Sequence, residues 1–341
     1  MKPAGRILIV NQNWMGDVLF STPAIRALRK NFPQSFISCL VPERAADVLR
    51  HNPHLNEVLT YDERASLISF FKPARLWRLI VARRFDTVLF FHRSRSKAFI
   101  AMLAGIPERI GFASPGRRRF LTQPVPKPAQ GLHKTDVFLN LVQAAGVRPA
   151  GREPDFEVTA EEKRSLDKKL MNEGLAPSEA FAVLHAGGNW FLKRWPIEYF
   201  VRWTGAFLKE TGWKVVVCGT ASEEKLAQDI LAQYPGGKVV SLCGKTTLGE
   251  LGALMIRAKF LISNDSGPIH VAASQGTKIL GLYGPTSEVL TGPISTSRVK
   301  ILRKEVGCEV PCYFKDCNHR VCMELLSPEE VCVHTRELIG Q

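Results

Sequence analysis

The sequence has no apolar run long enough to form a transmembrane helix. A transmembrane helix needs about 18 or more consecutive apolar residues, and no segment of this chain approaches that length. The amino terminus leads straight into the apolar run Arg6 to Val10, which is too short for a signal peptide. We therefore expect a protein that is made in the cytoplasm and stays there.

Common motifs of nucleotide and metal chemistry are also missing. No G-x-G-x-x-G occurs anywhere in the chain, which removes the main support for a hydride-transferring enzyme. Gly244-Lys245-Thr246 resembles the end of a Walker loop, but Val239 stands where the first glycine is required, so ATP hydrolysis is disfavoured. The eight cysteines include no paired C-x-x-C of the kind that holds structural zinc.

The cysteines are nevertheless unevenly distributed. Five crowd the carboxyl-terminal end: Cys308, Cys312, Cys317, Cys322 and Cys332. Because a reducing cytoplasm disfavours disulfides, the sequence favours reduced structural thiols. A zinc or iron–sulfur site, with His319 as a further ligand, is the alternative.

Acidic residues are almost missing from the segment between Arg64 and Lys134. It contains fifteen Lys or Arg but only two acids, Asp86 and Glu108, so it carries nearly all of the net charge of +14. Its densest clusters contribute six cations: Arg93, Arg95, Lys97, Arg117, Arg118 and Arg119. Such clusters attract a nucleic acid, an acidic membrane surface or a substrate with several phosphates and carboxylates. A solvated face without a partner is the alternative.

Strand-like and helix-like segments alternate along the chain, which predicts parallel sheets with crossover helices. The expected strands are Arg6 to Val10, Phe36 to Val41, Glu57 to Thr60, Asp86 to Phe91, Phe181 to His185, Lys214 to Cys218, Val239 to Leu242, Phe260 to Ser263 and Lys278 to Tyr283. The expected helices include Asp17 to Lys30, Glu43 to His51, Leu67 to Arg83, Lys97 to Ala104, Leu132 to Ala145, Ser222 to Tyr234, Leu248 to Ile256 and Pro328 to Ile339.

The length and one linker divide this α/β pattern into two domains. At 341 residues the chain exceeds the roughly 250–300 residues at which a single core stops growing. Gly146 to Pro154, with two Gly and two Pro, is the best linker. We expect two doubly wound, Rossmann-like domains, 1–155 and 156–324, and a carboxyl-terminal helix in 325–341. Ligands of such sheets bind beyond the carboxyl ends of the strands, so the cleft between the domains is the expected site.

The polar stretch from Asn264 to His270 follows an apolar strand and predicts a helix start. Ser266 is expected to cap this helix, and Pro268 suits its first turn. Free N–H groups and the helix dipole at such a start bind phosphate. An ordinary turn is the alternative, because Asn, Asp, Ser, Gly and Pro are the usual turn residues. His270 either donates to phosphate, orients Asp265 or has a structural role.

The segment between the strand that ends at His185 and the next helix carries further candidates. Gly187 and Gly188 let a ligand approach the backbone. Lys193 and Arg194, which precede the next helix, can neutralise a diphosphate leaving group.

Acids stand after two other strands. Glu223 or Glu224, beyond Gly219, either binds ribose hydroxyls or is a solvated first-turn acid, and the spacing does not decide between them. In the first half, Asp17 either caps its helix or acts as a general base.

The order and spacing of these motifs give a family resemblance over nearly the whole chain. They are Met15-Gly16-Asp17-Val18 with Thr22-Pro23-Ala24, Lys193-Arg194-Trp195-Pro196, Asn264 to His270, Gly284-Pro285-Thr286, and Cys312 to Met323. Together they resemble family nine glycosyltransferases, the ADP-heptose:lipopolysaccharide heptosyltransferase group. The resemblance implies a GT-B architecture, an acceptor-binding amino-terminal domain, a nucleotide-sugar-binding carboxyl-terminal domain, and an inverting reaction without a bound metal or other cofactor.

The resemblance also assigns roles to residues. Asp17 matches the catalytic base, and Lys193 the diphosphate contact. The residues expected to bind the nucleotide sugar are Gly187, Gly188, Lys193, Arg194, Glu223, Asp265, Ser266, Gly267 and His270. The six clustered cations fall in the domain that binds the acceptor, and inner-core lipopolysaccharide carries lipid A phosphates and Kdo carboxylates.

The expected partners follow from the same resemblance. They are ADP-heptose as donor and Kdo-lipid A or a heptosylated core as acceptor, bound by a monomer at the inner face of the inner membrane without nucleic acid. A family nine transferase that uses another nucleotide sugar, a GT-B sugar-nucleotide epimerase and a polyanion-binding protein are the alternatives.

Overall fold

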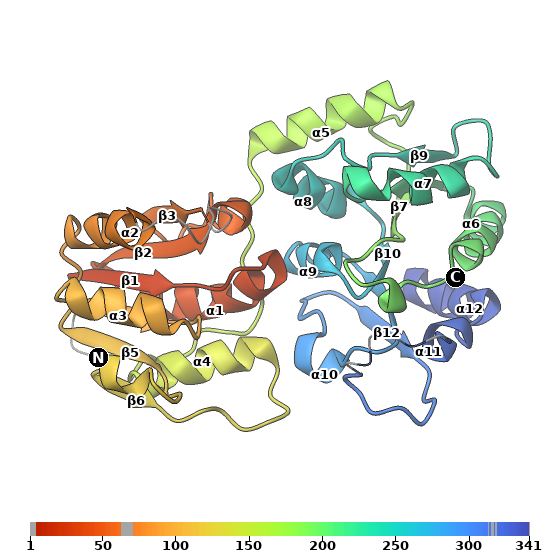
Figure 1. Cartoon of the computed structure of the whole chain (residues 1–341). Coiled ribbons are helices and arrows are strands. Elements are labelled where there is room, and N and C mark those ends of the chain that lie inside the picture. The colour runs from red at the N-terminus through yellow and green to blue at the C-terminus, as the bar shows by residue number, and fades with distance from the viewer. Residues whose placement is uncertain (1–4, 63–70, 313, 315–316, 318, 341) are drawn as a thin grey trace. The chain divides into compact units, whose positions relative to one another are not determined.

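The computed structural model describes residues 5–62, 71–312, 314, 317 and 319–340. The chain divides into two compact units, Met1–Asp155 and Phe156–Gln341 (Figure 1). Each unit is built around a six-stranded sheet whose described strands all pair in parallel.

The sheet of unit 1 has the strand order β3-β2-β1-β4-β5-β6. Its strands are β1 (Arg6–Val10), β2 (Phe36–Pro42), β3 (Glu57–Tyr61), β4 (Thr87–Phe90), β5 (Glu108–Phe112) and β6 (Gln123–Val125). The helices are α1 (Met15–Asn31), α2 (Phe71–Val81), α3 (Arg95–Leu103) and α4 (Lys134–Ala144), with 3-10 turns at Glu43–Val48 and Arg118–Phe120. Because α1 packs on α4 and α2 on α3, the central strands β1 and β4 are covered by helices on both faces, which explains their continuous apolar runs.

Unit 2 repeats this plan with the strand order β12-β11-β10-β7-β8-β9. Its strands are β7 (Phe181–His185), β8 (Lys214–Val217), β9 (Val239–Ser241), β10 (Leu261–Asn264), β11 (Ile279–Tyr283) and β12 (Val299–Arg303). The helices are α5 (Ala160–Asn172), α6 (Ile197–Thr211), α7 (Glu224–Leu231), α8 (Leu248–Arg257), α9 (Gly267–Ser274), α10 (Glu288–Thr291), α11 (Val321–Glu324) and α12 (Pro328–Ile339), with 3-10 turns at Phe191–Lys193 and Ala221–Glu223.

The last helix, α12, packs on α6 of unit 2. Val331 and Leu338 belong to the core of that unit, and the indole of Trp203 donates a 3.0 Å hydrogen bond from Nε1 to Thr335 Oγ1. The carboxyl-terminal helix is therefore part of the second compact unit.

All nine expected strands are confirmed, but three strands were not predicted. These are β5 and β6, which end one side of the first sheet, and β12, which ends one side of the second. β5 and β12 mix charged and apolar residues, and β6 is only three residues long and contains a proline, so they carry little of the signal of a buried strand. The helix expected from Glu43 is a 3-10 turn instead. The part of the expected helix that precedes residue 71 lies outside the described residues.

The connections reverse direction between β1 and β4 in unit 1 and between β7 and β10 in unit 2. Ligands of doubly wound sheets bind at this point, beyond the carboxyl ends of the strands. We call these two regions the unit 1 edge and the unit 2 edge. Of the described helices, none is long and apolar enough to span a membrane.

Candidate functional site

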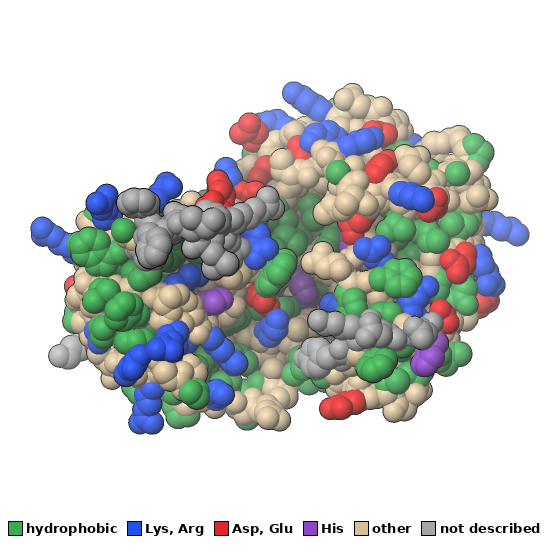
Figure 2. Space-filling model, in the orientation of Figure 1, with side chains coloured by type: hydrophobic (Ala, Val, Ile, Leu, Met, Phe, Trp, Pro, Cys, Tyr) green, Lys and Arg blue, Asp and Glu red, His purple; other side chains and the backbone are tan. Residues whose placement is uncertain are grey.

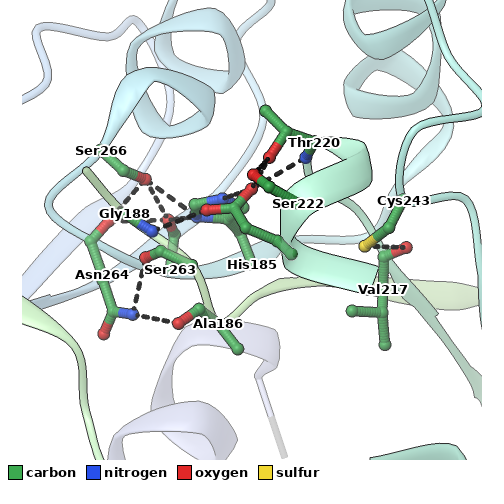
Figure 3. Close-up of polar contacts among 12 residues, drawn as sticks. His185, Ala186, Gly188, Val217, Thr220, Ser222, Cys243, Ser263, Asn264 and Ser266 are labelled. Carbon is green, nitrogen blue, oxygen red and sulfur yellow. Dashed lines mark hydrogen bonds and ion pairs between the residues drawn. The ribbon is translucent and has the colours of Figure 1, made fainter. Parts of the chain in front are cut away.

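Asn264, at the end of β10, holds the loops of the unit 2 edge together (Figure 3). Its Nδ2 donates to the carbonyl oxygens of Ala186, at 2.8 Å, and Gly187, at 3.0 Å. Its Oδ1 accepts a 3.0 Å hydrogen bond from the backbone N–H of Trp195. Because Asn264 is fully buried, these bonds fix the glycine pair and the Lys193–Trp195 segment against the start of α9.

Ser266 occupies the N-cap position of α9, but its side chain does not cap the helix. The expectation of a serine cap is therefore wrong. The Ser266 hydroxyl instead lies 2.9 Å from Nδ1 of the buried His185, and it donates a 3.2 Å hydrogen bond to the carbonyl oxygen of Asn264. With Pro268 in the first turn, as expected, the N–H groups of this helix start are not blocked by a side chain of Ser266.

Asp265 is buried between two groups at the unit 2 edge. Its Oδ2 lies 3.0 Å from Lys193 Nζ, and the carboxylate is only 6% exposed against 25% for the lysine side chain. On its other side is Tyr283, the last residue of β11, whose pKa is raised well above 10 by burial and by the Asp265 carboxylate. The tyrosine therefore stays protonated, and Lys193 is held at the start of α9.

Glu223 closes the glycine loop after β7. Its Oε1 accepts a 2.8 Å hydrogen bond from the backbone N–H of Gly188, and its Oε2 accepts from the backbone and hydroxyl of Thr220. Burial by itself would raise the pKa of Glu223, but the hydrogen bond from His185 and those from Thr220 outweigh it and hold the pKa far below its usual range. The carboxylate is ionised at neutral pH.

This position explains the glycine pair and separates the two candidate acids. A Cβ on Gly187 would lie 1.8 Å from Glu223 Oε1, so only glycine fits beside the carboxylate. Gly188 has a φ of +148°, which favours glycine as well. Glu224 turns away, and its Oε2 accepts a 2.8 Å hydrogen bond from Ser241. Of the two acids, Glu223 is the one at the unit 2 edge.

Three neighbouring side chains complete the unit 2 edge. Arg194 donates from Nε and Nη2 to the carbonyl oxygen of Gly188, at 2.9 and 2.6 Å. Trp195 is buried against Tyr199 and Phe200 and donates from Nε1 to a carbonyl, so it packs rather than stacks on a ligand. His270 is buried within α9.

At the unit 1 edge, Asp17 lies in the first turn of α1 without capping it, because the N-cap residue is Trp14. Its Oδ1 lies 2.5 Å from Nζ of Lys134, the first residue of α4. The Asp17 side chain is 19% exposed, so solvent or a substrate hydroxyl can reach it. Nothing in the sequence pointed to Lys134, which is 117 residues away along the chain.

The six cations expected to bind the acceptor differ in exposure. Arg93, Arg95, Arg118 and Arg119 are exposed, Lys97 is half-buried and Arg117 is buried. Figure 2 shows Lys and Arg side chains gathered over the part of unit 1 that holds α3, β5 and β6. Lys97 donates to the Tyr61 hydroxyl and lies 4.0 Å from the centre of its ring.

His92, which follows β4, lies among these cations. Burial and the charges of Lys97 and Arg117 lower its pKa to about 4. Its Nδ1 accepts a 3.0 Å hydrogen bond from the backbone N–H of Ser94. The ring is therefore neutral at neutral pH and adds no charge to the unit 1 edge.

The carboxyl-terminal cysteines meet in one pocket of unit 2. Cys308, Cys312, Cys317 and Cys322 line it together with His319, whereas Cys332 is buried in α12. All eight cysteines are free thiols. Among the described residues, no group of three or more His, Cys, Asp or Glu is arranged to hold a metal ion.

Comparison with known proteins gives the family of the chain. Residues 73–320 match the family described as Glycosyltransferase family 9 (heptosyltransferase). The chain belongs to this family. It is therefore a glycosyltransferase, and its two parallel α/β units are those of a GT-B fold.

Curated family members resemble the enzyme over most of its length. "Lipopolysaccharide heptosyltransferase 2" of Salmonella typhimurium is 26% identical over 320 residues, which cover 89% of each chain. "Lipopolysaccharide heptosyltransferase 3" of Escherichia coli is 26% identical over 301 residues, which cover 82% of each.

Solved structures show the same fold. A family 9 glycosyltransferase from Veillonella parvula superposes with a TM-score of 0.88 at 26% identity, covering 100% of this chain and 99% of the other. ADP-heptose lps heptosyltransferase II of E. coli has a TM-score of 0.81 at 23% identity, covering 98% and 99%. An E. coli heptosyltransferase solved with ADP-2-deoxy-2-fluoro heptose has a TM-score of 0.75 at 19% identity, covering 97% and 99%.

Proposed function

We propose that this glycosyltransferase moves a heptose from ADP-heptose to an anionic acceptor of the lipopolysaccharide inner core, with inversion at the anomeric carbon. The observation that carries the proposal is the unit 2 edge, where Lys193, Asp265 and the start of α9 are held together in a family 9 chain. The sugar and the acceptor class are taken from the names of the curated relatives, which are lipopolysaccharide heptosyltransferases.

In the proposed reaction, unit 2 binds the nucleotide sugar. The diphosphate lies at the amino terminus of α9, where backbone N–H groups and the helix dipole favour negative charge. Lys193 exchanges Asp265 for a phosphate oxygen, and Arg194 adds positive charge beside it. Glu223, which fixes the glycine loop through Gly188, binds the ribose hydroxyls.

The chemical step is a single displacement. The acceptor hydroxyl oxygen bonds to the anomeric carbon while the bond from that carbon to the diphosphate oxygen breaks, and ADP leaves with the electron pair. Asp17 takes the hydroxyl proton, which is the role of a general base. Lys193, Arg194 and the α9 amino terminus stabilise the charge that builds on the departing diphosphate.

The cationic segment of unit 1 supports an anionic acceptor. Lipid A phosphates and Kdo carboxylates match four exposed arginines in chemistry and sign. The same charges favour a location at the inner face of the inner membrane, where anionic lipids attract basic surfaces.

The decisive test is turnover with defined substrates. Purified enzyme is incubated with ADP-heptose and either Kdo-lipid A or a heptosylated core, and the mass of the acceptor is measured by mass spectrometry. We expect the acceptor to gain one heptose and ADP to be released in equal amount. Transfer from a UDP or GDP sugar, with none from ADP-heptose, would show that the donor is another nucleotide sugar. Release of a free sugar without acceptor would favour an epimerase.

A further inference from the structure

The proposed reaction gives no role to His185, a buried side chain of the unit 2 edge. It is the last residue of β7 and is 2% exposed. An imidazole that is taken out of water is stable only when its nitrogens have polar partners. Both ring nitrogens of His185 face polar side chains, and these come from different elements of unit 2 (Figure 3).

One ring nitrogen faces an acid. Nε2 of His185 lies 3.6 Å from Oε2 of Glu223, whose carboxylate is ionised because its pKa is held far below the usual range. A carboxylate accepts hydrogen bonds only, so the proton of the ring is favoured on Nε2. The carboxylate is itself fixed, since it also accepts hydrogen bonds from Gly188 and Thr220. Glu223 therefore sets the orientation of the imidazole ring.

The other ring nitrogen faces two serines. Nδ1 of His185 lies 2.9 Å from Oγ of Ser266 and 3.4 Å from Oγ of Ser263. Ser263 lies opposite His185 in the pairing of β7 with β10, and its hydroxyl donates a 2.7 Å hydrogen bond to the carbonyl oxygen of Asn264. Ser266 makes the shorter contact, so it is the serine that Nδ1 holds.

This contact keeps Ser266 from a role that its position favours. Ser266 is the N-cap residue of α9, where a serine hydroxyl ordinarily accepts a hydrogen bond from the N–H of the second or third helical residue. The second residue is Pro268, which has no N–H, so a cap would fall on Ile269. The Ser266 side chain makes no such bond, and the Ile269 N–H donates to the carbonyl oxygen of Ser266 at 3.2 Å instead.

The first turn of α9 has few N–H groups to offer a ligand. Because Pro268 has none, only Gly267 and Ile269 contribute an N–H among the first three helical residues. A cap by Ser266 would occupy one of these two groups. A diphosphate would then have to displace the serine, which costs about 1 kcal/mol, or about fivefold in affinity.

We propose that His185 is a positioning residue for the donor: it holds the Ser266 hydroxyl off the amino terminus of α9, so that the helix start stays open to the diphosphate. The inference rests on the proposed function, from which it takes the place of the diphosphate. His185 acts through Ser266 and does not touch the donor. Glu223, which orients the ring, thereby supports the diphosphate as well as the glycine loop.

Two substitutions separate the roles of the two ring nitrogens. The amide of His185→Asn lies close to the position of Nδ1 and should still hold Ser266. The amide of His185→Gln reaches the position of Nε2, so it should keep the contact with Glu223 and release the serine. Calorimetric titration with ADP should give a Kd about fivefold above that of the wild type for His185→Gln, and within about twofold of it for His185→Asn.

Removal of the serine hydroxyl is the control. Ser266→Ala cannot cap the helix, so His185→Gln/Ser266→Ala should bind ADP as tightly as Ser266→Ala alone. A structural role of His185 predicts instead a loss of affinity that persists in the double variant. That persistence, an unchanged Kd in His185→Gln, or equal losses in His185→Gln and His185→Asn would each overturn the proposal.

A second experiment needs no ligand. Hydrogen exchange of the Ile269 amide is followed by NMR in the unliganded protein. It should be at least about twofold slower in His185→Gln than in the wild type, because a capped N–H is protected from exchange. In the double variant it should return to the rate of Ser266→Ala. Equal rates in His185→Gln and the wild type contradict the proposal. If the wild type does not bind ADP, the proposed function fails, whereas this exchange pattern still decides whether His185 controls Ser266.

Discussion

Cationic side chains are paired differently at the two sheet edges. At the unit 2 edge, Lys193 pairs with Asp265, and Arg194 is bound to the carbonyl oxygen of Gly188. In unit 1, four arginines of the basic segment are exposed, and Arg117, beside the ends of β4 and β5, is buried without a described partner. In the proposed function, a ligand of unit 2 replaces existing contacts, whereas an anionic ligand of unit 1 supplies missing ones. Compensated charge keeps a site rigid before binding, and uncompensated charge draws a polyanion from a distance.

Asp17 is the exception at the unit 1 edge, since it carries negative charge among cations. Asp17→Asn should lower kcat by about a thousandfold, within the range of roughly 10²–10⁴ for general-base catalysis. Initial rates with saturating donor and acceptor measure this, and circular dichroism checks the fold.

Asp136→Asn is the matched control, because Asp136 also lies in the first turn of a unit 1 helix and pairs with a cation, Arg152. It should keep near-normal turnover. A similar loss in both variants would remove Asp17 from the chemistry.

The next largest effect concerns the compensated charge of unit 2. Lys193→Met should weaken ADP binding by about tenfold to a hundredfold, because a hydrogen bond to a charged group contributes roughly 1.5–3 kcal/mol. Calorimetric titration with ADP measures the loss. Lys214→Met is the control, since Lys214 pairs with Glu179 at the start of β8. Equal ADP affinity in the wild type and Lys193→Met would show that the edge does not hold the diphosphate.

A third prediction tests how tightly the unit 2 edge is packed. Gly187→Ala places a methyl group against the Glu223 carboxylate and should destabilise the enzyme by about 1–3 kcal/mol, as overpacking does. Denaturant unfolding measures the loss. In a double-mutant cycle, Glu223→Ala should cancel most of it, because the clash disappears with the carboxylate. If the losses in unfolding free energy were additive in the double mutant, the clash with the Glu223 carboxylate would not be their cause.

The last prediction concerns the pH dependence of the unit 1 edge. The pKa of His92 is lowered from 6.5 to about 4 in the folded state, so the unfolded chain binds this proton first as the pH falls. The stability of the wild type should decrease between pH 6.5 and 4, and His92→Gln should flatten this part of the profile. Unfolding free energies at several pH values measure the difference. Identical profiles would show that His92 does not titrate as expected.

The sequence predicted the fold and some of the residues that lie at each edge, because these depend on local signals. Strand alternation and the polar turn at Asn264 are local signals, so nine strands and the start of α9 were found before the structure. Gly187 and Glu223 were predicted only as two unrelated candidates. Gly188 and Glu223 are 35 residues apart, and their hydrogen bond forms only when β7 and β8 pair and bring the loops after them together. His185 and Tyr283 were not assigned roles, since a polar residue at a strand end has no distinctive spacing.

The amino-acid sequence by itself determined the two α/β units, the family and the excess of positive charge in the first unit. These depend on periodicity, motif order and composition, which are properties of the chain. Only the tertiary structure decided the contacts and burial of the polar side chains. Ser266 faces His185 instead of capping the helix, and Glu223 rather than Glu224 supports the glycine loop. Arg117 is buried, while Arg118 and Arg119 are exposed. Burial and pairing depend on which strands become neighbours, and that is fixed only when the sheets assemble.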